Sequence, residues 1–148
     1  MIPIETLIEL VGIATEPWGS HGQFHAVQPT PQSIERIRRE LNITIPEDYV
    51  RIASSFHASD DQPALAQHFV LLNHGHDGDC DCWDRRMFTA SGERPIVYID
   101  LESATEPSGR RFETFRAYIE NFVRYATPRS AADSRRRRAK LLLEECGA

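Results

Sequence analysis

The sequence has few cysteines and no long hydrophobic run. Its three cysteines are an odd number, which is not typical of a disulfide framework. The N-terminus carries no basic stretch followed by an apolar core, as a secretory signal would. Apolar runs such as Phe69 to Leu72 are far shorter than the roughly 20 residues that a membrane helix needs. We therefore expect a cytoplasmic protein in a reducing compartment, with no membrane span.

Sequence patterns that mark common enzymes are also missing. The chain has no glycine-rich phosphate-binding loop, and no known nucleophile motif surrounds Cys80 or Cys82. It shows no internal repeat or low-complexity linker, and its 148 residues suffice for one hydrophobic core. We therefore expect a single domain without catalytic activity and without a cofactor.

Positive charge is scarce in most of the chain. Residues 1–128 carry 19 acidic and 11 basic side chains, a formal charge of −8, whereas residues 129–148 carry 6 basic and 3 acidic ones, a charge of +3. An acidic body attracts basic partners and repels nucleic acid through its long-range field. We expect one domain over residues 1–128, and over residues 129–148 a basic helix that is part of this domain or loosely docked on it.

Four consecutive arginines, Arg135–Arg138, lie in this predicted C-terminal helix. Successive helical residues are about 100° apart, so the four side chains point nearly all round the axis and leave no apolar face there. Only Ala139, Leu142 and Leu143 are placed to dock on the domain. The arginines are typical of a solvated helix end, and we expect no nucleic-acid partner.

Apolar residues at helical spacing predict five helices. Thr30 followed by Pro31 is a typical helix start, a hydroxyl cap and then proline in the first turn. Pro46 before an acidic pair indicates a second such start. The predicted ranges are Pro3 to Thr15, Pro31 to Asn42, Pro46 to Phe56, Phe112 to Ala126, and Ser130 to about Glu145.

Between the third and fourth of these helices the pattern favours strands. The predicted strands are His68 to Asn73, Asp79 to Asp84 and Ile96 to Ile99, with His57 to Gln67 and Leu101 to Arg111 predicted as loops. Ile96 to Ile99 is rich in β-branched residues and apolar on both faces, as a covered strand should be. Because the strands are contiguous and hairpin-like, we expect an α+β domain: an antiparallel sheet of three or more strands with helices packed on one side.

Several short motifs occur in an order that resembles a known family. The segment LNITIPEDY, Leu41 to Tyr49, follows a helix rich in Glu and Arg; Gly78-Asp79 leads into a strand; and Pro95 to Asp100 is a strand ending in an acidic residue. Together with an early Trp18 and the helix from Phe112, these motifs resemble the Smi1/Knr4 (SUKH) superfamily over roughly residues 18–123. The resemblance implies a non-catalytic α+β binding domain. Bacterial members are largely immunity proteins that neutralise a toxin, often a nuclease, whereas fungal relatives regulate cell-wall synthesis.

Acidic side chains and the two tryptophans are the candidate partner-binding residues. Trp is favoured at the centre of protein interfaces, and clustered carboxylates suit a basic toxin domain. Asp84 is the candidate for a buried carboxylate, since it lies on the strand face opposite Asp79 and Asp81; Arg85 and Arg86 are too near in sequence to be its obvious partner. The predicted surface comprises Trp18, Asp60, Asp61, Asp77, Asp79, Asp81, Trp83 and Asp84.

A metal-dependent enzyme and a regulatory scaffold are the alternatives. The segment from His74 to Cys82 holds His, Asp and Cys, the common metal-ligating residues. However, one residue separates Cys80 and Cys82, instead of the two to four of a typical zinc site, and an EF-hand would require glycine at Cys82 and glutamate at Phe88. We therefore predict that no metal binds and that the two cysteines are small core residues.

Overall fold

The computed structural model shows an α+β fold, as the sequence predicts. It describes residues 1–15, 30–55, 64–66, 69–74, 80–100, 107, 109–126 and 133–147. Within these ranges the elements are α1 (Ile4–Thr15), α2 (Pro31–Leu41), α3 (Glu47–Ala53), β1 (Ala64–Ala66), β2 (Phe69–His74), β3 (Cys80–Asp84), β4 (Ile96–Ile99), β5 (Arg111–Phe112), α4 (Phe115–Ala126) and α5 (Asp133–Glu145). No helix of the described residues is both long and apolar enough to cross a membrane.

The strands form one antiparallel sheet in sequence order, β1-β2-β3-β4-β5. β3 is the central strand. Its Trp83 pairs with Ile96 of β4, and its Asp81 pairs with Tyr98. Because directly paired residues share a face, Asp81 and Trp83 lie on one face of the sheet together with Ile96 and Tyr98.

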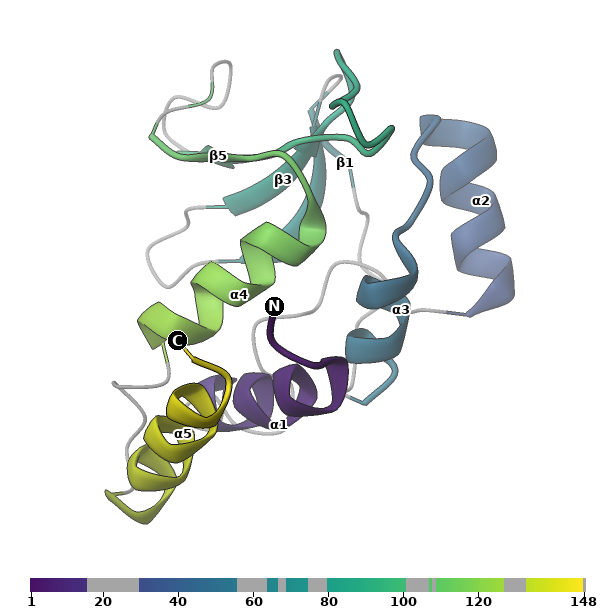
Figure 1. Ribbon diagram of the computed structural model, residues 1–148. Coiled ribbons are helices and arrows are strands. Elements are labelled where there is room, and N and C mark those ends of the chain that lie inside the picture. The colour runs from purple at the N-terminus through teal and green to yellow at the C-terminus, as the bar shows by residue number, and fades with distance from the viewer. Residues whose placement is uncertain are drawn as a thin grey trace.

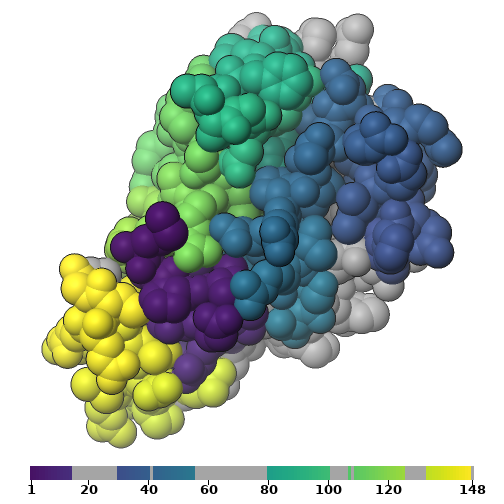
Figure 2. All heavy atoms as spheres, turned by 45° about the vertical axis from the view of Figure 1, so that its right-hand side comes forward, coloured from purple at the N-terminus to yellow at the C-terminus, as the bar shows by residue number. Residues whose placement is uncertain are grey.

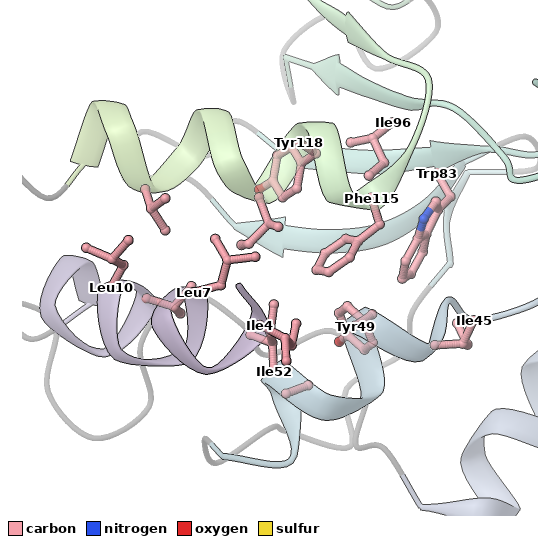
Figure 3. Packing of buried hydrophobic residues seen from close by; sticks show 14 of the residues in the cluster. Ile4, Leu7, Leu10, Ile45, Tyr49, Ile52, Trp83, Ile96, Phe115 and Tyr118 are labelled. Carbon is pink, nitrogen blue, oxygen red and sulfur yellow. The ribbon is translucent and has the colours of Figure 1, made fainter. Parts of the chain in front are cut away.

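Helices pack against this face, with α4 next to the sheet and α1 beneath α4 (Figure 1). The Tyr49 ring of α3 lies edge-on to the rings of Trp83 and Phe115, with 5.4 Å between centroids in both pairs. Figure 3 shows these three rings packed between β3, α3 and α4, with Leu7 and Leu10 extending the core below α4. The predicted arrangement, with helices on one side of the sheet, is confirmed.

The predicted start of α2 is confirmed in detail. The Thr30 hydroxyl accepts a hydrogen bond from the Ser33 amide at 3.1 Å, and the Ser33 hydroxyl accepts one from the Thr30 amide at 3.2 Å. This reciprocal capping box satisfies two amides that a helix start otherwise leaves without partners. The helix ends at Leu41 and is capped by Asn42, whose φ of 54° is left-handed, a conformation that asparagine tolerates better than most residues.

Two short strands were not predicted. Phe112, expected in the fourth helix, pairs with Ile96 in β5, and α4 begins three residues later. The Glu93 carboxylate accepts from the Phe115 amide at 2.9 Å and so caps α4 at that point. Ala64–Ala66 forms β1 inside a predicted loop, because its three residues, Ala-Leu-Ala, are too few to give an alternating signal.

The two ends of the described chain lie close together. α5 packs along α1 through Ala139 and Leu142, both buried as predicted, and Arg138 donates to Glu9 at 2.7 Å. This bond lowers the pKa of Glu9. The Ile2 amide donates to the Glu120 carboxylate of α4 at 2.8 Å, and Arg116 donates to the Ile2 carbonyl at 2.6 Å. α1 is therefore fastened to both C-terminal helices.

Candidate functional site

β3 determines where three of the predicted binding residues lie. Trp83 is only 1% exposed and packs against Tyr49, so it cannot contact a partner. The prediction that Trp83 anchors an interface is therefore wrong. The reason is that helices cover the sheet face to which Trp83 belongs, and strand alternation alone does not indicate which face is covered.

Asp84 is buried at the end of β3, as predicted. Its partner is Arg86, which the sequence did not predict. The Arg86 guanidinium donates to both carboxylate oxygens, from Nη2 at 2.9 Å and from Nε at 3.0 Å, and the Arg86 amide donates at 2.9 Å. The chain turns directly after Asp84, which brings a residue two positions away into reach, as in an Asx turn. The expectation that Arg86 is too near in sequence to pair with Asp84 is wrong for this reason.

Beyond Asp84 the β3–β4 connection forms a tightly held tip, residues 85–94, which we call the hairpin tip. The Thr89 amide donates to the Glu93 carbonyl at 2.8 Å and closes the turn. Gly92 has a φ of 85°, a left-handed backbone conformation that favours glycine. Arg94 is 7% exposed and donates to the carbonyls of Arg85 at 2.7 Å, Met87 at 3.2 Å and Asn42 at 3.2 Å. Burial lowers the pKa of Arg94.

The hairpin tip exposes two large apolar side chains. Phe88 is 62% exposed and Met87 is 38% exposed. The Arg94 guanidinium carbon lies 3.6 Å from the Phe88 ring centroid, a cation–π contact that restrains the ring. Figure 2 shows the hairpin tip, in teal, at the top of the molecule beside α2.

A pocket of about 340 Å³ opens between the sheet and α4. Asp81, Arg110 and Asn121 contribute its polar groups. The Tyr118 hydroxyl donates to the Asp81 carboxylate at 2.7 Å, and Arg110 donates to the Asn121 side-chain oxygen at 3.0 Å. Its walls are mainly the aromatic side chains Tyr98, Phe112, Tyr118, Phe122 and Tyr125. We call this cavity the aromatic pocket.

The predicted acidic surface is only partly described. Asp81 lies in the aromatic pocket, where it is half-buried, and Asp84 is buried against Arg86, so neither belongs to an open acidic face. Apart from the buried Trp83, the remaining members lie outside the described residues: Trp18, Asp60, Asp61, Asp77 and Asp79.

Cys80 and Cys82 are buried, as predicted for small core residues. β2 and β3 pair His74 opposite Cys80, while residues 76–79 of the cluster lie outside the described part. Among the residues that the structure does describe, no three His, Cys, Asp or Glu side chains are grouped as a metal site.

Sequence reasoning missed the hairpin tip and the aromatic pocket. The adjacent apolar pair Met87-Phe88 within a short, turn-rich connection was the available signal for the tip. The aromatic pocket has no local signal, because β3, β4, β5 and α4 all contribute to it.

Comparison with known proteins provides no relative for this fold and these sites. No family model, curated protein or solved structure matches the chain. The resemblance to the Smi1/Knr4 superfamily therefore stays a prediction.

Proposed function

We propose that this chain is a non-catalytic, protein-binding domain of the Smi1/Knr4 type that neutralises a toxin. The observation that carries the proposal is the hairpin tip, which presents Met87 and Phe88 to solvent on a rigid support. Aromatic residues, Met and Arg are enriched in protein interfaces. An exposed Phe that is already fixed loses little conformational entropy on binding, which favours affinity.

The order of elements supports the family part of the proposal. The segment Leu41 to Tyr49 runs from the last residue of α2 through the connector into the first turn of α3, and β3, β4 and α4 follow in the order that the resemblance implies. The buried side chains of this connector, Ile43 and Ile45, and Tyr49 at the start of α3 belong to the core. These residues of the motif therefore have a packing role and are not available to a partner.

Replacement of Phe88 by Ala is expected to lower the affinity for the partner at least about 30-fold, the loss typical of an interface hot spot. The partner to test is the C-terminal domain of a large secreted protein encoded next to this gene. Growth arrest caused by that domain should be rescued by the native chain and not by the Phe88→Ala variant. Leu141→Ala is the matched control, since Leu141 is 53% exposed on α5, and it should rescue fully.

Two outcomes would contradict the proposal. Full rescue by Phe88→Ala, with unchanged affinity in calorimetry, would exclude the hairpin tip from recognition. Absence of any neighbouring toxin domain that the native chain neutralises would favour a regulatory scaffold instead.

Association with a basic partner is expected to slow at least about tenfold between low salt and 0.5 M salt, because the formal charge of −8 over residues 1–128 steers encounter. The screening length is only about 8 Å at physiological ionic strength, so salt weakens long-range attraction. Close packing contacts in the complex are not affected in this way. The dissociation rate should change less than about threefold. Stopped-flow kinetics of the native chain and of a variant with Asp60→Asn and Asp61→Asn measure both rates. An association rate that does not change with salt and is equal in the two proteins would contradict steering by these carboxylates.

A further inference from the structure

We propose that the hairpin tip docks on an acidic surface of the partner protein, where carboxylates surround an apolar socket for Phe88. The inference rests on the proposed function for the partner being a protein, and it adds the chemistry of the surface that this partner presents. It follows from where an acidic chain places its basic side chains relative to the exposed Phe88 and Met87.

Basic side chains are concentrated around the hairpin tip. Residues 1–128 carry 11 basic side chains, and eight of them belong to three short segments: α2 (Pro31–Leu41), residues 84–94 and residues 110–113. These segments hold five acidic side chains, so their formal charge is +3, whereas the remainder of residues 1–128 holds 3 basic and 14 acidic side chains, a charge of −11. The tip therefore belongs to a positive surface on an otherwise acidic body.

Contacts bring the three segments together. The Arg94 guanidinium donates to the carbonyl of Asn42, directly after α2, and its carbon atom lies 3.6 Å from the Phe88 ring centroid. The Arg111 guanidinium of β5 donates to the Met87 sulfur at 2.9 Å. Figures 1 and 2 show the tip beside α2, with α5 at the opposite end of the molecule. Each exposed apolar side chain of the tip is thus in contact with an arginine.

The charge of this surface is open to solvent and only weakly paired. Arg39 is 68% exposed and lies 3.7 Å from the Glu40 carboxylate. Arg111 is 42% exposed and pairs with Glu113 at 2.9 Å. Exposed ion pairs of this kind contribute little free energy, so a partner's carboxylates can compete for these guanidinium groups. Basic side chains also outnumber acidic ones by three, so pairing within the three segments cannot neutralise the surface.

A partner that fits this surface has acidic groups around an apolar centre. Charges at a protein interface are arranged so that a positive patch meets a negative one. A guanidinium suits this contact because its planar fork of donors matches a carboxylate. A partner that is basic overall, as the acidic body favours, must therefore carry a local acidic patch where it meets the tip. The two opposite fields of the chain then orient the partner during encounter.

The test uses the isotope-labelled full chain and two peptides that share their leucines but differ in the sign of their charge. These are acetyl-Glu-Leu-Asp-Leu-Glu-amide and acetyl-Lys-Leu-Lys-Leu-Lys-amide. With the acidic peptide, amide chemical shifts at Phe88, Thr89 and Gly92 are expected to saturate in the millimolar range. The basic peptide should bind at least about tenfold more weakly.

Charge reversal on the surface should invert this preference. A variant with Arg39→Glu and Arg111→Glu should bind the acidic peptide at least about tenfold more weakly and the basic peptide more tightly. The matched control carries Arg137→Glu and Lys140→Glu on α5, where both side chains are exposed. It changes the formal charge equally, and at about 0.15 M salt, where the screening length is about 8 Å, it should leave both titrations unchanged. Circular dichroism checks that each variant folds, and Arg39→Gln with Arg111→Gln, which only removes the charges, should weaken the acidic peptide severalfold.

Three results would overturn the assignment. They are equal binding of the two peptides, absence of saturating shifts at the tip with the acidic peptide, and binding of the acidic peptide that neither the reversal nor the glutamine variant weakens. Shifts confined to α5 count as the second of these, because they would place the peptide on the other arginine cluster. Acidic-peptide binding at the tip without any neutralised neighbouring domain would refute only the proposed function. Loss of rescue by Phe88→Ala without a preference for the acidic peptide would refute only the acidic partner surface.

Discussion

Replacement of Trp83 by Ala is expected to lower the free energy of unfolding by about 4 kcal/mol, the largest effect we predict for a single residue. The indole is 1% exposed and lies edge-on to Tyr49, so its removal opens a cavity between β3 and α3. The cavity also breaks the chain of rings that continues from Tyr49 to Phe115. Urea denaturation followed by circular dichroism measures the change.

The matched variant is Trp83→Phe, which keeps an aromatic ring and should cost about half as much. Phe88→Ala, which removes an exposed ring, should cost less than about 1 kcal/mol. A loss below about 1 kcal/mol for Trp83→Ala, together with weaker partner binding, would instead support a role for this residue at an interface.

Replacement of Arg94 by Met is expected to lower the free energy of unfolding by about 3 kcal/mol, because a single buried guanidinium serves three backbone carbonyls. The bond to Asn42 ties the hairpin tip to the end of α2, and the other two hold the tip itself together. Amide exchange at Thr89 and Gly92, whose hydrogen bonds close the turn, should become faster than in the native chain.

Two controls accompany this variant. Arg39→Met removes an arginine that is 68% exposed and should change stability by less than about 0.5 kcal/mol. Arg94→Lys keeps the charge but not the fork of donors and should recover only part of the stability. Unchanged exchange at Thr89 and Gly92 in Arg94→Met would show that other contacts hold the tip. Arg94 would then not be needed to keep Phe88 in its exposed position.

Local signals in the sequence predicted much of the fold. The Thr30 cap, the apolar run of β4 and the docking residues of α5 depend on nearest neighbours along the chain, and all three predictions are confirmed. Phe112 was misplaced because it continues the apolar stripe of α4, and only pairing with Ile96 reveals a strand. Its position is thus set by a contact between residues distant in sequence.

The candidate sites were harder to predict than the elements. The alternation of side chains along β3 correctly predicted that Asp84 and Asp81 lie on opposite faces of the sheet. It did not indicate that helices cover the face on which Trp83 lies. The pair Met87-Phe88 marks the tip in the sequence but does not show that Phe88 is exposed, because large apolar side chains are more often buried. Asp81 was read as part of an acidic face, whereas Tyr118, far along the chain, makes it part of a pocket.

The fastening of α1 to α4 and α5 constrains the timing of folding during synthesis. α1 is synthesised before α4 and α5, but Leu7, Leu10 and Ile13 are fully buried in a core that includes residues of α4 and α5. The bonds between Ile2 and α4 span more than a hundred residues of chain. An apolar helix surface therefore stays uncovered until almost all described residues have been made, and this nascent chain is exposed to chaperones and to aggregation throughout that interval.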